Sequence, residues 1–238
     1  MTSDSLLRVE QISVRFGGVV AVDRVSLGAE AGRVTGLIGP NGAGKTTLFN
    51  VITGVQVPTS GRVVFEGSDV TRLAVHRRAR RGLARTFQRL EVFASLSVRD
   101  NIRVATELST IVDVGRRVDD LLERVGLVDV AERTAGDLPT GLARLVEIAR
   151  ALATEPRLLL LDEPASGLDE QETRLLGDLL RSLADDGLGV LVVEHDMDLV
   201  MKVCDAIHVL DLGQLIASGT PAEVQADRRV LEAYLGVA

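Results

Sequence analysis

The chain has 238 residues, of which 46% are hydrophobic and 26% charged, and its formal net charge is −7 at pH 7. This length allows one large domain or two lobes around a sizeable core. The negative charge argues against a general nucleic-acid-binding protein, because such proteins usually carry a basic surface. No apolar run approaches the roughly eighteen residues of a transmembrane helix. The start MTSDSLLRVE predicts no secretory signal, and the single cysteine, Cys204, fits a reducing cytoplasm.

Strand-like and helix-like runs alternate along the chain. Two N-terminal runs, LLRVEQISVRF and GRVVFEG, have the pattern of antiparallel strands. Three other runs are almost continuously apolar, which is typical of parallel strands buried on both faces: RVTGLIG (33–39), LLLLDE (158–163) and GVLVVEH (189–195). A helical stretch, ETRLLGDLLRSLADDG, separates the last two, so the predicted class is α/β.

The middle of the chain differs from both ends. Residues 87–155 are helical in pattern and lack buried-strand runs. We therefore predict one domain over 1–238, with a core lobe of 1–86 and 156–238 and a helical lobe of 87–155 inserted into it.

One helix of this lobe begins at a Pro-Thr-Gly corner, in DLPTGLARLVEIARAL (137–152). Its apolar residues recur at helical spacing along one face. Thr140 is the predicted N-cap, with Gly141 just behind it. By itself the pattern favours a capped structural helix, and a helix start that faces an anion is the alternative.

The stretch GPNGAGKTT fits the phosphate-loop pattern G-x-x-x-x-G-K-[ST], and it lies between a buried strand and a helix as that motif requires. Glycines let the backbone wrap an anion, and successive amides then point at it. Lys45 is expected to neutralise the β- and γ-phosphates, and the Thr46 hydroxyl to bind Mg²⁺. The predicted ATP-binding residues here are Gly39, Pro40, Asn41, Gly42, Ala43, Gly44, Lys45, Thr46 and Thr47.

Two carboxylates follow the leucine run 158–161. Asp162, at the strand end, is placed to hold Mg²⁺ through its water shell. Glu163, on the other side of the strand end, is placed to orient the attacking water or accept its proton. The alternative is a plain charged strand terminus.

His195 ends the third buried strand, within Glu194-His195-Asp196. In a parallel sheet it would share an edge with Lys45 and Asp162, where ligands bind. We interpret it as a contact to the γ-phosphate; a histidine with a purely structural role is the alternative.

The order of these motifs, with RTFQ at 85–88 and SGLD at 166–169, resembles the ATP-binding cassette of ABC transporters over essentially the whole chain. The resemblance implies a P-loop NTPase (RecA-like) α/β core with an antiparallel β subdomain and an inserted helical subdomain. It implies two cassettes packed head to tail, each ATP lying between one phosphate loop and the other chain's signature helix. Thr140 and Gly141 would then face a neighbour's γ-phosphate.

Further roles follow only from that resemblance. Phe16 in VRFGG would stack on adenine, where the family often has Tyr and where a core Phe is the alternative. Gln88 would touch Mg²⁺ or the water and relay the nucleotide state to a membrane subunit. Ser166 and Asp169 would couple the two ATP sites.

Finer stretches, GGVVAVDRVSL, ARRGLARTFQ, VEHDMDLVM and GTPAEVQADRRVLEAYLG, are similar to the ATPase subunits of branched-chain amino acid importers. This implies an ATPase at the cytoplasmic face of the membrane, with permease subunits and an extracytoplasmic solute-binding protein. Close relatives serve urea and short-chain amide import, and the cassette of the lipopolysaccharide exporter differs at RTFQ and EHDM. The stretch 88–137 is shorter than is usual in the branched-chain group.

The signature departs from the family pattern Leu-Ser-x-Gly-Gln, because Pro139 replaces the serine and Leu142 the glutamine. Proline supplies no donor, and each lost charge-assisted hydrogen bond is worth about 1.5–3 kcal/mol. The Gly141 amide and the helix dipole remain, and Thr140 is a substitute donor if the corner turns differently. We therefore favour a heterodimer, in which a companion cassette supplies the better signature; a homodimer is the alternative.

HRRARRG (76–82) is the only dense basic cluster. It fits a solvated helix face, or a contact with anionic lipid headgroups or an acidic loop of the membrane subunit. Outside transport, the alternative is a soluble ABC ATPase of DNA repair or translation, but the chain has neither a long coiled-coil insertion nor a second cassette. A non-hydrolysing regulatory cassette is a third possibility, against which Glu163 and His195 argue.

Overall fold

A computed structural model describes residues 5–108 and 112–235. It contains two β-sheets. The larger has six strands in the order β10-β9-β3-β8-β7-β6 and the smaller four in the order β2-β1-β4-β5. Strands of the larger sheet are β3 (Val34–Ile38), β6 (Leu83–Arg85), β7 (Leu158–Asp162), β8 (Gly189–Val193), β9 (Ala206–Asp211) and β10 (Gln214–Gly219). Those of the smaller are β1 (Leu7–Phe16), β2 (Val19–Ala29), β4 (Ser60–Phe65) and β5 (Ser68–Asp69).

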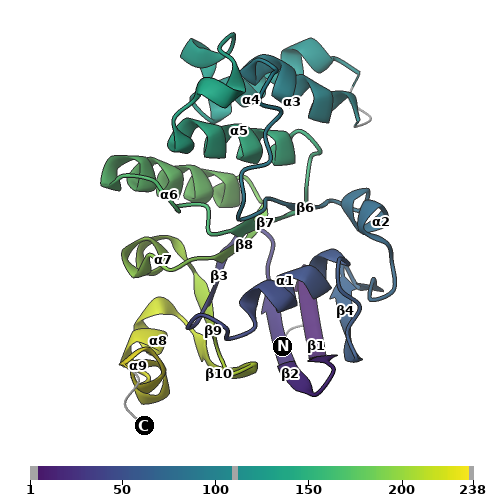
Figure 1. Cartoon of the computed structure of the whole chain (residues 1–238), viewed down its shortest axis with the longest axis vertical. Coiled ribbons are helices and arrows are strands. Elements are labelled where there is room, and N and C mark those ends of the chain that lie inside the picture. The colour runs from purple at the N-terminus through teal and green to yellow at the C-terminus, as the bar shows by residue number, and fades with distance from the viewer. Residues whose placement is uncertain (1–4, 109–111, 236–238) are drawn as a thin grey trace.

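Helices cover both faces of the larger sheet. The α-helices are α1 (Lys45–Thr53), α2 (Val75–Ala79), α3 (Val98–Glu107), α4 (Val114–Arg124), α5 (Thr140–Leu152), α6 (Glu170–Asp185), α7 (Met197–Val203), α8 (Pro221–Ala226) and α9 (Arg228–Leu235). Figure 1 shows α3, α4 and α5 grouped at one end of the molecule, and the sheet of β1, β2 and β4 beside α1 at the other.

The leucine run of β7 explains why a continuous apolar strand is needed. Leu158 and Leu160 pack in the core shared with α1 and the smaller sheet, whereas Leu159 and Leu161 pack in the core beneath the helical layer. Side chains of a strand point alternately to opposite faces, so both faces of β7 are buried. β7 pairs in parallel with β6 and β8, and β8 with β3, which confirms the α/β class and the parallel core.

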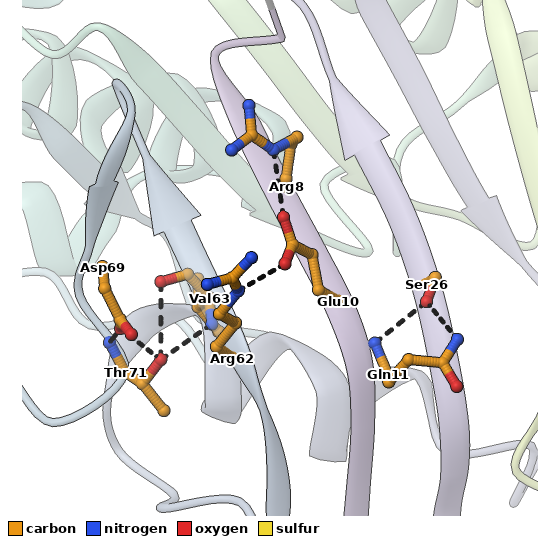
Figure 2. A network of polar contacts seen from close by, with 8 residues as sticks. All are labelled: Arg8, Glu10, Gln11, Ser26, Arg62, Val63, Asp69 and Thr71. Carbon is orange, nitrogen blue, oxygen red and sulfur yellow. Dashed lines mark hydrogen bonds and ion pairs between the residues drawn. The ribbon is translucent and has the colours of Figure 1, made fainter. Parts of the chain in front are cut away.

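The smaller sheet is antiparallel, since β1 pairs in that direction with both β2 and β4. This confirms the prediction for the two runs that form β1 and β4. Its exposed face carries the polar network of Figure 2, where Glu10 accepts from Arg8 at 3.2 Å and also pairs with Arg62. The hydrogen bond from Arg62 lowers the pKa of Glu10. Leu7 and Val9 are fully buried, and so are Ile12 and Val14 beyond a register shift of β1. One face of this sheet therefore packs in the core that it shares with α1.

The sheet order brings the predicted motifs to one edge. β3, β8 and β7 are neighbours, and their carboxyl ends lead into the glycine-rich loop, His195 and Glu163 respectively. Between β6 and β7 the chain forms α3, α4 and α5, with two short 3₁₀ turns at Val128–Val130 and Ala135–Asp137. The exact lobe boundaries at 87 and 155 stay a prediction.

Candidate functional site

The loop between β3 and α1 requires glycine at two positions, where any side chain would clash with neighbouring backbone. Gly39 and Gly44 have φ angles of 148° and 101°, a region that favours glycine. A Cβ on Gly39 would lie 2.0 Å from the Leu210 carbonyl oxygen, and one on Gly44 would lie 2.6 Å from that of Ala21. The loop therefore leads tightly into the N-terminus of α1, where backbone amides favour an anion.

Lys45 is the first residue of α1 and is 6% exposed. Its ammonium group donates to the carbonyl oxygens of Gly39 at 2.6 Å and Pro40 at 3.0 Å, which folds the side chain back over the loop. Burial lowers the pKa of Lys45, opposed by the charges of Glu163 and Asp162. Among the other predicted loop residues, Ala43 is buried, Thr47 is half-buried, and Asn41, Gly42 and Thr46 are exposed.

Asp162, at the end of β7, is 2% exposed and paired with a buried arginine that the sequence did not single out. Arg85 donates from Nη2 to Asp162 Oδ2 at 2.8 Å and from Nη1 to Asn50 Oδ1 at 2.6 Å. Its guanidinium carbon lies 4.8 Å from the centre of the Phe87 ring. Arg85 thereby connects β6, β7 and α1.

The three residues predicted as catalytic lie in one hydrogen-bonded row. Glu163 Oε2 accepts from Gln88 Nε2 at 2.7 Å, and Glu163 Oε1 lies 2.6 Å from His195 Nε2. The His195 side chain is 44% exposed and that of Glu163 18%. A carboxylate held from both sides and still open to solvent is placed to bind a water molecule.

Backbone contacts fix Glu163 in an unusual conformation. Its φ is 50°, in the left-handed region, which costs a non-glycine residue about 1–3 kcal/mol. Its amide donates to the Val193 carbonyl at 2.9 Å, and its carbonyl accepts from the Ser166 amide at 3.1 Å. These bonds to β8 and to the following loop hold the side chain turned out of the strand.

Glu194 anchors two of these segments and was not predicted to act. Its carboxylate is buried and accepts from the Ala165 amide at 2.6 Å and from the His195 amide at 3.0 Å. Burial raises the pKa of Glu194, opposed by these amides. The sequence shows Glu194 directly before His195, but no feature of the sequence pattern indicates that its side chain is buried.

Oxygen ligands for a divalent cation lie at the same edge. The Thr46 residue is exposed, and Asp162 Oδ1 is the carboxylate oxygen that Arg85 does not use. Across residues 5–108 and 112–235, no group of three or more His, Cys, Asp or Glu could hold a metal by itself. Mg²⁺ typically takes one or two protein ligands together with phosphate oxygens and water, so these residues fit Mg²⁺ bound together with a nucleotide.

Phe16 ends β1 and is 51% exposed, so the interpretation of it as a core residue is wrong. It stands opposite Val19 on the β1–β2 hairpin. The same hairpin contributes Ala21, whose carbonyl lies against Gly44. The adenine contact stays a prediction.

The Pro-Thr-Gly corner differs from the sequence expectation by one residue. Helix α5 begins at Thr140 itself and its N-cap is Pro139, so the prediction of Thr140 as N-cap is wrong. Proline fixes the extended turn here, and no side chain caps the helix. Leu142 is half-buried and packs with the apolar core of the helical layer.

The segment Ser166–Asp169 lies beside this corner within the same chain. Asp169 caps α6, accepting from the Glu172 amide at 2.8 Å, while Glu172 Oε2 accepts from the Asp169 amide at 3.0 Å. The same carboxylate covers Gly141, where a Cβ would lie 2.3 Å from Glu172 Oε1. The two segments are therefore in direct contact.

Comparison with known proteins identifies similar ATP-binding cassettes over nearly the whole chain. A family profile described as "ABC transporter" matches residues 22–166, and one described as "Branched-chain amino acid ATP-binding cassette transporter" matches 214–238. The chain is 41% identical to the high-affinity branched-chain amino acid transport ATP-binding protein BraF of Pseudomonas aeruginosa, covering 99% of this chain and 100% of that protein. This protein belongs to the ABC transporter ATP-binding family.

An export cassette and a solved cassette structure are also similar to this chain. The lipopolysaccharide export system ATP-binding protein LptB of Escherichia coli is 35% identical, covering 97% of each chain. The ADP conformation of an ATP-binding cassette of an ABC transporter superposes with a TM-score of 0.89, at 33% identity over 98% of this chain and 99% of that chain. The cassette is thus an ATPase that works with membrane-embedded subunits. None of its helices within 5–108 and 112–235 could span a bilayer.

Charged residues of α5 hold the segment that carries Gln88. Arg144 donates to the carbonyl oxygens of Phe87 at 3.0 Å and Gln88 at 2.5 Å, and to Glu147 at 2.9 Å. Glu147 in turn accepts from the Glu91 amide at 2.6 Å. The spacing of Arg144 and Glu147 was visible in the sequence, but the segment they bind is some fifty residues away in the chain and was not.

A groove of about 320 Å³ opens beside this segment. Its lining comes from α2 (Val75 and Ala79), from the strand end and loop at 83–87, and from Glu147 and Arg150 of α5, among other residues. The groove therefore lies between α2 and the 83–87 segment on one side and α5 on the other, next to the residues that hold Gln88.

Proposed function

We propose that this cassette is the ATP-hydrolysing subunit of a membrane importer for branched-chain amino acids or a related small polar solute. The observation that carries the proposal is the profile match at 214–238 to branched-chain amino acid cassettes, together with relatives named for that transport at 39–41% identity. The 35% identity to an export cassette keeps an exporter as the second candidate. Urea or amide import is an alternative within the importer class.

The chemistry that we propose uses the row described above. A water molecule bound to Glu163 attacks the γ-phosphorus, its proton passes to the Glu163 carboxylate, and the bond to the β–γ bridging oxygen breaks. His195 contacts the γ-phosphate, and Lys45 neutralises charge on the phosphates. Mg²⁺, held by Thr46, Asp162 and Gln88, would supply charge stabilisation when bound.

Two cassettes are needed in this proposal, because one chain's phosphate loop faces the other chain's Thr140 and Gly141. Ser166 and Asp169 couple the two sites. The position of Leu142 supports a weak signature, since its side chain packs on apolar core residues rather than offering a donor. We therefore propose a heterodimer with a second cassette, bound to permease subunits at the cytoplasmic face and supplied by an extracytoplasmic solute-binding protein.

Steady-state ATPase activity over a concentration series tests the dimer. We expect the purified chain to bind ATP tightly and turn it over slowly, and the double change Pro139→Ser with Leu142→Gln to raise turnover of the homodimer. Glu163→Gln in either background is the matched control that should abolish turnover. Fast, cooperative hydrolysis by the unchanged homodimer would rule out the heterodimer.

Uptake of radiolabelled leucine tests the solute. The cassette is expressed with permeases, a companion cassette and a solute-binding protein from its own organism, in cells that lack their own importers. Uptake that depends on Glu163 supports the proposal. Uptake of urea or amides but not of leucine would favour the urea or amide importer. Release of lipid without uptake of any of these solutes would favour the exporter.

A further inference from the structure

The basic cluster at 76–82 divides into one buried side chain and several exposed ones. Arg78 is 2% exposed. Arg77, Arg80 and Arg81 are exposed, as is Arg72 just before α2. The interpretation of the cluster as a solvated helix face does not hold for Arg78, which turns into the protein.

Arg78 fixes the orientation of the whole segment. Its guanidinium donates to the carbonyl oxygens of Val51 at 2.7 Å and Ile52 at 2.6 Å, near the C-terminal end of α1. It also donates to Leu73 at 3.0 Å and Thr71 at 2.8 Å, and burial lowers its pKa to about 10. The turn that presents the exposed arginines is thus held rigidly on the helix that follows the phosphate loop.

The exposed arginines have no acidic partner. Arg72, Arg77, Arg80 and Arg81 make no ion pair or side-chain hydrogen bond with any residue in 5–108 or 112–235. By contrast, exposed arginines such as Arg174 and Arg228 pair with a glutamate one turn away. Four uncompensated charges on about ten residues form a local positive surface on a protein of net charge −7.

This surface borders the groove beside the Gln88 segment. Val75 and Ala79 of α2 line the groove, but none of the four arginines does. Figure 1 shows α2 at the edge of the molecule next to β6, on the side away from α8 and α9. The arginines therefore lie on or next to the helix that contributes Val75 and Ala79 to the groove, and Val75 itself is 47% exposed.

We infer that Arg72, Arg77, Arg80 and Arg81 bind anionic phospholipid headgroups when the cassette is docked on its membrane subunits. The inference rests on the proposed function, in which the cassette is bound to permease subunits at the membrane. Guanidinium groups bind phosphate in a bidentate manner. A folded acidic segment of a permease would require a shaped site, whereas these arginines line no part of the groove and suit a fluid array of headgroups.

The full-length chain is tested by sedimentation with vesicles of phosphatidylcholine alone and of phosphatidylcholine mixed with phosphatidylglycerol, at low and at physiological ionic strength. We expect binding to the anionic vesicles only, weakened by salt. Arg77→Ser with Arg80→Ser should lower the partition coefficient about 25-fold, since each arginine near an anionic surface is worth about fivefold. Arg77→Lys with Arg80→Lys should keep most of the binding.

The matched control is Arg116→Ser with Arg133→Ser, which removes the same charge from two exposed arginines of the helical lobe. It should leave the partition coefficient within about twofold, and ATP binding by every variant confirms that each one folds. Equal loss in the control pair, or no binding of the unchanged chain to anionic vesicles, would overturn the inference. If the chain does not bind vesicles, and the Arg77→Ser, Arg80→Ser variant no longer co-purifies with the permease subunits, the inference is overturned and the arginines bind the permease instead. Because the vesicles contain no permease, a failed uptake experiment leaves this result unaffected.

Discussion

Replacing Arg85 by Ala should be among the most destabilising single changes in the core lobe. The side chains of Arg85 and Asp162 are only 7% and 3% exposed, and their charged atoms lie 2.8 Å apart. Arg85→Ala leaves the Asp162 carboxylate buried without its partner, which costs about 3–5 kcal/mol of unfolding free energy. The lost contact with the Phe87 ring adds about 0.5–2 kcal/mol.

Urea unfolding measures this loss. With a total loss of about 3.5–7 kcal/mol and a slope of about 2–3 kcal/mol per molar urea, the midpoint should fall by about 1–3.5 M. Arg157→Ala is the matched control, because Arg157 pairs with Glu66 at 3.3 Å while both side chains are largely exposed, at 66% and 40%. Such a surface pair is worth less than about 1 kcal/mol.

A double-mutant cycle separates the ion pair from general damage. Arg85→Ala combined with Asp162→Asn should cost less than the sum of the two single changes, by about 2 kcal/mol or more, because asparagine removes the unpaired charge. If Arg85→Ala costs no more than Arg157→Ala, or if the two changes add without coupling, the buried pair does not support this edge of the sheet as we argue.

Three further predictions concern single residues. Glu194→Ala should lower turnover more than it raises the KM for ATP, because the amides of Ala165 and His195 lose their common acceptor; unchanged turnover would contradict this. Burial raises the pKa of Glu194 above its ordinary 4.5, so its contribution to stability is full below that pH and declines as the pH rises through the folded value. Thermal unfolding of Glu194→Gln between about pH 4 and 7 should therefore show a flatter profile than the unchanged chain. Burial raises the pKa of the Cys204 thiol to about 12, so iodoacetamide at about pH 8 should label it only after unfolding; rapid labelling of the native chain would refute its burial.

Much of the site was readable from the sequence because its residues lie in short local patterns. The glycine-rich loop, Asp162 and Glu163, and His195 each follow a buried strand directly, and strand ends of a parallel sheet meet at one edge. The structure indeed brings Glu163 within 2.6 Å of His195, and it places Gln88 on the other side of Glu163. Apolar periodicity was likewise enough for β3, β7, β8, α5 and α6.

The residues that hold this edge together were decided only by the tertiary structure. Arg85, Arg78 and Glu194 are charged, and a charged residue in a sequence is expected at the surface unless its partners are known. Their partners lie far along the chain: Asp162 for Arg85, the end of α1 for Arg78, and the loop after β7 for Glu194. Periodicity reports which face of an element is buried, but not which distant carbonyl, amide or carboxylate meets a buried charge there.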